Sequence, residues 1–215
     1  MTPDAVINYL SQHPEFFEDQ ADFLATIMIP HPHGGRAIPI GERQILTLRE
    51  KSKRLEDKLR ELLEFGEQND AIGDKLHRLA LALLKARDLE SAVAALHFNL
   101  REDFAVPHTV LRLWPQGADL QLPGTGPASA AAREFAASLS SPYCCAHAMV
   151  DTAAWFGEAA SHLRSFAYVA LKSDQAFGLL ALASEDAQRF YPEMGTLYLK
   201  RLGEMTAAAV LRYLT

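Results

Sequence analysis

Between Glu42 and about Ala86 the chain contains no proline, and one apolar row repeats every seven residues. The row consists of Leu48, Leu55, Leu62, Asn69, Leu76 and Leu83. A heptad row on an otherwise polar segment is typical of a long helix that packs against another helix. We therefore expect a stalk helix whose row mediates self-association, with a homodimer as the expected assembly.

A second apolar row shifts along this stalk. It consists of Ile45 and Leu59 early on and of Phe65, Ile72 and Leu79 later. The shift indicates a break or a change of partner near Gly66 and Gly73. Asn69 would fix the register of a dimer if it were buried, whereas it would lie exposed if the helix bends there. The stalk could instead fold back onto its own domain as core.

The 215 residues are 49% hydrophobic and 22% charged, which is typical of a globular protein. The formal net charge is −6, and basic and acidic residues alternate between Glu42 and Glu64, so nucleic-acid binding is not expected. No stretch reaches the roughly 18 apolar residues of a membrane span, and the first residues lack the pattern of a secretion signal. We therefore expect a cytoplasmic protein without a membrane partner.

The chain is predicted to have two regions, a helical region of residues 1–86 and a mixed domain of residues 87–215. In the first region, apolar spacing predicts two short helices within residues 3–28, separated at His13-Pro14. Three prolines and three glycines in residues 30–41 predict a hinge or turn before the stalk.

The second region is predicted to contain both strands and helices, and Asp88 is a suitable cap for its first helix. Strands are expected at 108–114, 119–122 and 143–150, and helices at 129–139, 151–160 and 193–214. The clearest pattern is an antiparallel hairpin in which strands 164–171 and 177–183 flank a polar turn. This order predicts an α+β fold, an antiparallel sheet with the terminal helices on one face.

Residues 177–214 resemble the closing strand and helix of GAF domains, with a glycine-led apolar strand, a Ser-x-Asp turn, a phenylalanine and a helix. The whole chain also resembles the DUF484 family of uncharacterised bacterial proteins. The motifs that carry this resemblance are His13-Pro14-Glu15-Phe16-Phe17, Pro30-His31, Gly41-Glu42-Arg43-Gln44, and Asp186 through Arg189-Phe190 to Met194-Gly195-Thr196. The resemblance implies a GAF-like fold and no established activity, and it leaves any cofactor unknown.

GAF domains as a class bind cyclic nucleotides, tetrapyrroles or other small molecules, or dimerise through their terminal helices. The Asn-Lys-Phe-Asp-Glu signature that accompanies cyclic-nucleotide binding is absent from this sequence. The resemblance therefore implies a small-molecule or protein partner without naming it. Arg189 and Phe190 are expected to anchor the turn before the last helix.

A sheet covered by helices on one face can form a ligand pocket on the other, here beneath residues 123–162. Our candidates for lining it are Arg112, Trp114, Cys144, Cys145, His147, Trp155 and Phe156. Since strand residues alternate, leucines that face the helices would direct Arg112 toward the pocket. Arg112 could then hold a carboxylate or phosphate, or form a structural ion pair. Trp155 and Phe156 could be pocket walls or an apolar lid.

The adjacent pair Cys144 and Cys145 suits neither a metal site nor a disulfide. Adjacent cysteines are poor joint ligands for a tetrahedral ion, and no second pair completes a set, so no metal site is expected. A thiol activated by His147 is one interpretation, and an ordinary half-buried cysteine is the other.

These patterns lead to three hypotheses. The first is a non-enzymatic GAF-like sensory or adaptor module that self-associates through its long helix and binds an unidentified small molecule. The second is a structural dimer whose pocket is filled by its own side chains. The third is a thiol-dependent reductase, because some proteins of GAF fold reduce methionine sulfoxide with cysteines.

Overall fold

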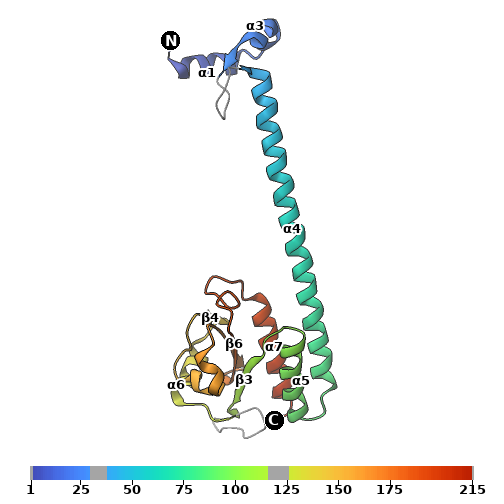
Figure 1. The fold of residues 1–215 in the computed structure, drawn as a ribbon, viewed down its shortest axis with the longest axis vertical. Coiled ribbons are helices and arrows are strands. Elements are labelled where there is room, and N and C mark those ends of the chain that lie inside the picture. Colours follow the sequence, from blue (N-terminus) through green and yellow to red (C-terminus); the bar gives the residue numbers. More distant parts are fainter. Residues whose placement is uncertain (1, 30–37, 116–125, 215) are drawn as a thin grey trace. The chain divides into compact units, whose positions relative to one another are not determined.

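The computed structural model describes residues 2–29, 38–115 and 126–214, and the chain forms two compact units, Met1–Gln68 and Asn69–Thr215 (Figure 1). The boundary therefore lies within the stalk helix, in place of the predicted division between residues 86 and 87. The last turns of that helix belong to the second unit because their apolar side chains pack into its core.

The first unit begins with three short helices where the sequence predicts two. They are α1 (Pro3–Gln12), α2 (Glu15–Asp19) and α3 (Ala21–Thr26). Pro14 precedes α2, as expected, and Gln20 separates α2 from α3. Strands β1 (Met28–Ile29) and β2 (Ile38–Pro39) then pair antiparallel, a ribbon that the sequence analysis missed. Residues 30–37 of the predicted hinge lie outside the described residues.

The long helix α4 (Ile40–Lys85) confirms the predicted stalk. It continues through Gly66 and Gly73, so the shift of the second apolar row does not mark a break in the helix. In the second unit Leu79 is fully buried, whereas in the first unit Leu59 is exposed. No helix in the described part of the chain is both long and apolar enough to cross a membrane.

The second unit is built on a four-stranded antiparallel sheet with the strand order β3-β6-β5-β4. The strands are β3 (His108–Leu113), β4 (Tyr143–Cys145), β5 (Ser165–Lys172) and β6 (Ala176–Ser184). The β5–β6 hairpin confirms the predicted one, with Val169 opposite Leu180. The expected strand at 119–122 lies outside the described residues.

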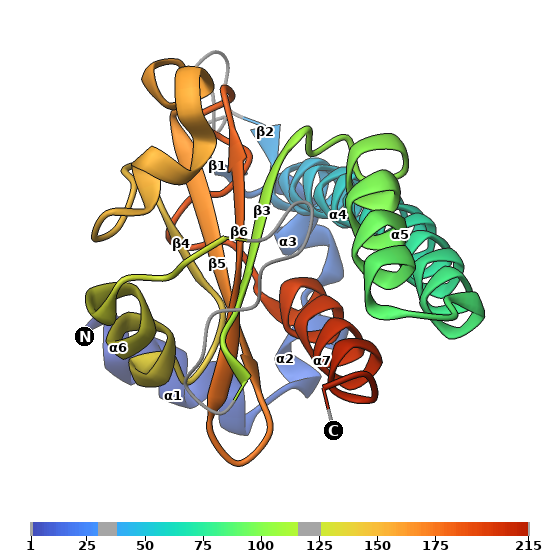
Figure 2. The same cartoon turned by 90° about the horizontal axis from the view of Figure 1, so that it is seen from below.

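Helices cover both faces of this sheet, with α5 (Leu89–Glu102) and α7 (Leu197–Leu211) on one side (Figure 2). The side chain of Asp88 accepts a hydrogen bond from the Ser91 N–H, which caps α5 as predicted. On the opposite face lie α6 (Ala130–Ser138) and the 3₁₀ segment η2 (Thr152–Ser161). The predicted α+β fold, an antiparallel sheet with the terminal helices on one face, is therefore present.

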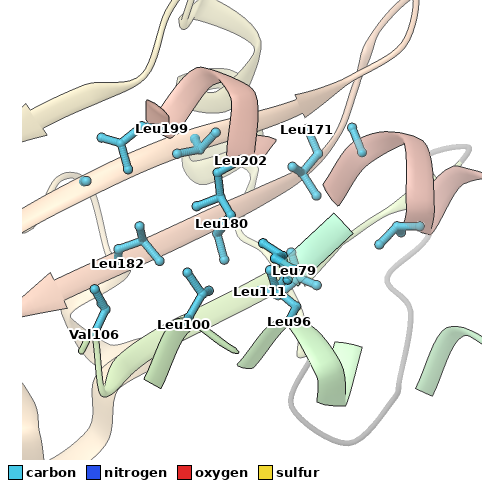
Figure 3. Close-up of a cluster of buried hydrophobic side chains, with 14 of the residues drawn as sticks. Leu79, Leu96, Leu100, Val106, Leu111, Leu171, Leu180, Leu182, Leu199 and Leu202 are labelled. Carbon is cyan, nitrogen blue, oxygen red and sulfur yellow. The ribbon is translucent and has the colours of Figure 1, made fainter. Parts of the chain in front are cut away.

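The main core of the second unit lies between the sheet and the helices α4, α5 and α7. Leu79, Leu96, Leu111 and Leu180 of four different elements are each at most 1% exposed and point toward one another (Figure 3). At about 1.5–3 kcal/mol for each fully buried leucine, this cluster is a main source of stability.

Helix α7 lies unusually close to strand β5 at Gly203. A Cβ atom built at Gly203 would lie 2.4 Å from Cγ1 of Val169, closer than real side-chain contacts allow. The β-branched Val169 has little freedom to move aside. Glycine at position 203 is therefore needed for this helix–sheet packing.

We expect Gly203→Ala to lower the free energy of unfolding by about 1–3 kcal/mol, because the new methyl group overpacks the contact with Val169. Urea denaturation followed by circular dichroism measures the change. Gly73→Ala is the matched control, since a Cβ at Gly73 meets no atom within 4 Å. In α4 that change is expected to stabilise the protein by roughly 0.5–1 kcal/mol. Equal effects of both substitutions would contradict the close packing.

Candidate functional site

Strand β3 separates its side chains between the two faces of the sheet. Leu111 and Leu113 are fully buried in the core under α5 and α7. Trp114, just after the strand, packs in a second cluster on the opposite face, and Arg112, two residues before it, contacts Trp155 on that face. The alternation therefore directs Arg112 toward the face where a pocket is predicted.

The guanidinium group of Arg112 lies against an aromatic ring. Its central carbon is 5.2 Å from the ring centroid of Trp155, a cation–π distance. A Cβ at Gly126 would lie 2.5 Å from Nη1 of Arg112, so only glycine permits the guanidinium to lie this close to the backbone. Trp155 and Arg112, two of the predicted pocket residues, are thus brought together.

A second arginine on this face contacts the other tryptophan. The central carbon of the Arg133 guanidinium is 5.7 Å from the ring of Trp114, and Nε donates to the carbonyl of Ala128 at 3.2 Å. The indole N–H of Trp114 donates to the carbonyl of Ala176 at 3.0 Å. Trp114 thus uses its polar atom within the fold, and the sequence analysis did not single out Arg133.

The centre of this face is occupied by aromatic side chains that contact one another. Tyr168 packs edge-on against Phe135 with ring centroids 5.3 Å apart and stacks with Phe166 at 6.4 Å. Phe156 packs edge-on against Phe166 at 5.9 Å. Phe156 therefore packs within this aromatic cluster, and these rings lie in the described part of the region where a pocket is predicted.

Tyr168 is also the centre of a buried hydrogen-bond network. The hydroxyl of Thr152 donates to the carbonyl of Met149 at 2.7 Å. The hydroxyl of Tyr168 in turn donates to Thr152 Oγ1 at 2.6 Å and accepts the N–H of Met149 at 3.0 Å. Burial raises the pKa of Tyr168, so the phenol stays protonated and able to donate. This network fixes the start of η2 over the sheet.

The two cysteines point to opposite faces of the sheet. Cys144 belongs to the core under the helices, and Cys145 belongs to the aromatic cluster. The thiol of Cys145 contacts the backbone carbonyl of His147 at 3.0 Å, while the His147 side chain is exposed. His147 thus contacts this thiol through its main-chain carbonyl. Its exposed imidazole is not the group that contacts the thiol and does not activate it through this contact.

Burial makes both thiols weaker acids. It raises the pKa of Cys144 from 9.0 to about 11, and the neighbouring Cys145 adds to this effect. Burial also raises the pKa of Cys145, partly offset by its hydrogen bond to His147. Because the thiolate is the nucleophile, neither environment activates a cysteine. Within the described residues no group of three or more His, Cys, Asp or Glu side chains is placed to hold a metal ion.

The predicted dimerisation row divides into two parts. Leu48, Leu55 and Leu62 are 64%, 62% and 65% exposed, and Asn69 is exposed as well. Leu76 and Leu83 are only 6% and 2% exposed, because both pack into the core of the second unit. These last two leucines therefore pack as core of their own domain, which is the alternative that the sequence left open for the stalk.

Comparison with known proteins shows that the fold of the second unit is that of a GAF domain. The GAF domain of a phosphoenolpyruvate-protein phosphotransferase from Coxiella burnetii aligns with a TM-score of 0.52 at 15% identity, covering 66% of this chain and 93% of that one. The free methionine-R-sulfoxide reductase of Neisseria meningitidis aligns with a TM-score of 0.49 at 18% identity, covering 66% and 89%. At these identities the likeness concerns the fold alone.

The sequence itself belongs to the family described as "Protein of unknown function, DUF484", whose model matches residues 1–215. An uncharacterized protein of Salmonella typhimurium, YigA, is 25% identical over 217 residues, which cover 98% of this chain and 91% of the relative. The family resemblance found in the sequence is thereby confirmed.

We expect Tyr168→Phe to destabilise the second unit by about 1–3 kcal/mol, because the Met149 N–H and the Thr152 hydroxyl each lose a buried partner. Urea denaturation measures the loss. Tyr143→Phe is the matched control, since the Tyr143 side chain is exposed and packs edge-on against the same Phe135 ring. A loss for Tyr168→Phe no larger than for the control would contradict the network.

We expect Cys144 and Cys145 to react slowly with iodoacetamide in the native protein. A pKa raised from 9.0 to about 11 leaves the Cys144 thiol with about a hundredfold less thiolate at neutral pH, and burial slows access further. Intact-mass spectrometry follows the labelling, with the urea-unfolded chain as the control. Labelling of the native protein as fast as of the unfolded chain would show that a thiol is reactive.

Proposed function

We propose that the protein is a non-enzymatic sensory or adaptor module of GAF-like fold that self-associates as a homodimer through the first part of α4. The observation that carries this proposal is the exposure of Leu48, Leu55 and Leu62 on one stripe of the helix. Helices of this kind gain most of their stability from packing an apolar stripe, and a long stripe in water lacks that contribution.

The spacing of the stripe suits a second copy of the same helix. Ile45, Ser52, Leu59 and Gly66 alternate with Leu48, Leu55 and Leu62 at intervals of three and four residues. This is the pattern of the two core positions of a coiled coil. The stripe is self-complementary, so a second chain in parallel register supplies a matching surface without any further partner.

The flanking charges also favour a parallel pair. In a parallel coiled coil, a residue before one core position faces the residue five positions further along in the other chain. This rule pairs Lys51 of one chain with Glu56 of its mate, and it pairs Lys58 with the apolar Leu63. Opposite charges therefore meet in the Lys51–Glu56 pair, and there is no repulsion between like charges in the Lys58–Leu63 pair.

The other features of the second unit favour a structural role over a chemical one. The raised pKa values and burial of the two thiols do not support the thiol-dependent reductase. The packed aromatic cluster around Tyr168 supports a structural use of the sheet face where a ligand pocket is predicted. The proposed self-association through α4 therefore does not require a ligand on that face.

We expect the full chain to be a dimer in solution, and Leu55→Lys/Leu62→Lys to weaken the dimer at least about a hundredfold. Two leucines per chain leave the interface, each worth about 1.5–3 kcal/mol, and four lysines would face one another. Sedimentation equilibrium over a range of concentrations measures the dissociation constant. Circular dichroism checks that the helix content is kept.

The matched control is Thr47→Lys/Gln68→Lys, which introduces two lysines with the same change of net charge at exposed positions on the outer side of the helix. This variant is expected to keep the dimer. A wild-type chain that stays monomeric at every concentration would overturn the proposal. Equal weakening in both variants would attribute the effect to net charge and would equally refute the leucine stripe.

A further inference from the structure

The second unit contains a cavity on the face of the sheet that α4, α5 and α7 cover, away from the predicted pocket. Its volume is about 260 Å³. The walls come from α4, the end of α5, strand β6, the loop before α7 and the first turn of α7. Most of the lining side chains are apolar, among them Ile72, Leu76, Phe104, Val106, Phe190 and Met194. The volume is just below the roughly 300 Å³ at which pockets for drug-sized ligands begin.

Two cationic side chains line this otherwise apolar cavity. The ammonium group of the half-buried Lys75 lies 6.0 Å from the centroid of the Phe104 ring. The guanidinium of Arg189 donates to the backbone carbonyl of the same Phe104. Both charges are thus held close to one residue of the wall. No Asp or Glu is among the described residues that line the cavity.

The beginning of α7 adds a third positive element. Gly195, Tyr198 and Leu199 line the cavity around the first turn of this helix. The side chain of Thr196 makes no capping hydrogen bond, and the first turn contains no acidic residue. The amino end of a helix carries about half a positive charge, which an acidic cap would normally balance. A negative group is the complement that this end of the cavity lacks.

From this combination we infer that the cavity binds a small amphipathic carboxylate, with its alkyl body among the apolar walls and its carboxylate facing Lys75 and Arg189. An uncharged apolar molecule would use the walls and leave both cations without a new partner. A small hydrophilic anion would pair with the cations and leave the apolar walls exposed to water. The site lies on the face of the sheet that α4, α5 and α7 cover, and it does not depend on self-association.

The cavity also gives a role to a sequence motif. Arg189, Phe190, Met194 and Gly195 all line it, although the sequence analysis treats the first two as anchors of a turn. Phe190 is buried, and Arg189 donates a hydrogen bond to the carbonyl of Phe104 in the segment after α5, so both do fix the loop. Their second use is to close one side of a binding cavity.

The test uses octanoate as the probe and the methyl group of Met194 as the reporter in the full-length, methionine-methyl-labelled protein. We expect octanoate to shift the Met194 resonance saturably, and 1-octanol at equal concentration to bind at least about tenfold more weakly. Charge-assisted hydrogen bonds of about 1.5–3 kcal/mol account for this ratio. Met149, in the aromatic cluster, and Met205, beside the separate groove of Ala80 and Leu84, are expected not to shift.

Two variants test the cations. Arg189→Gln and Lys75→Gln are each expected to weaken octanoate binding at least about fivefold, while Lys200→Gln, a change of an exposed lysine outside the cavity, leaves it unchanged. Lys75→Gln keeps the test valid if Arg189→Gln disturbs the fold. The inference is overturned if octanoate does not shift Met194, if Met149 or Met205 shifts in its place, or if the alcohol or the Lys75→Gln variant binds equally well.

Discussion

Burial of Leu76, Leu79 and Leu83 beneath the sheet is the interaction on which the arrangement of the second unit depends. These side chains make the last turns of α4 a wall of the domain core. The same turns supply the main-chain carbonyls of Leu83 and Ala86 that accept hydrogen bonds from Arg212 at the end of α7. The stalk helix and the C-terminal helix are thereby held by both apolar packing and polar contacts.

This burial also determines which part of the stalk is available to a partner. Up to Leu62 the apolar stripe has no cover from the described residues of its own chain, whereas from Ile72 onward the domain covers it. Where the domain core of the same chain covers the apolar row, the helix needs no second chain to bury it. The self-association that we propose for the uncovered part and the folding of the domain therefore rest on different residues of one helix.

The sequence is sufficient to predict those helices, strands and caps that local residue patterns specify. Heptad spacing predicts α4, alternation predicts the faces of β3, and the Asp88 cap and the β5–β6 hairpin follow from nearby residues alone. Heptad spacing specifies a face of a helix and not what covers it, so Leu55 and Leu76 are indistinguishable by pattern. Only the tertiary structure shows that one is exposed and the other buried.

Tertiary contacts likewise decide the roles of the candidate site residues. Trp155 and Phe156 were equally compatible with pocket walls and with packing, and the positions of Phe166 and Tyr168 favour packing. The short strand β4 places Cys144 and Cys145 on opposite faces, which residue spacing alone suggests but does not prove. The cavity beside Phe104 was not predictable, because its walls come from five separate segments of the chain.

The two faces of the sheet differ in what they can accommodate. On the aromatic face Tyr168 is held by ring contacts and by hydrogen bonds, so a ligand that reached this side chain would have to displace bonded groups. The face covered by α4, α5 and α7 contains a cavity whose positive charges are not balanced by any Asp or Glu among the described residues that line it. A ligand in that cavity could change self-association only by binding the associated and dissociated states with different affinity. The proposed ligand binding depends on Lys75 and Arg189, whereas the proposed self-association depends on Leu55 and Leu62. Substitutions can therefore remove either property without altering the residues of the other.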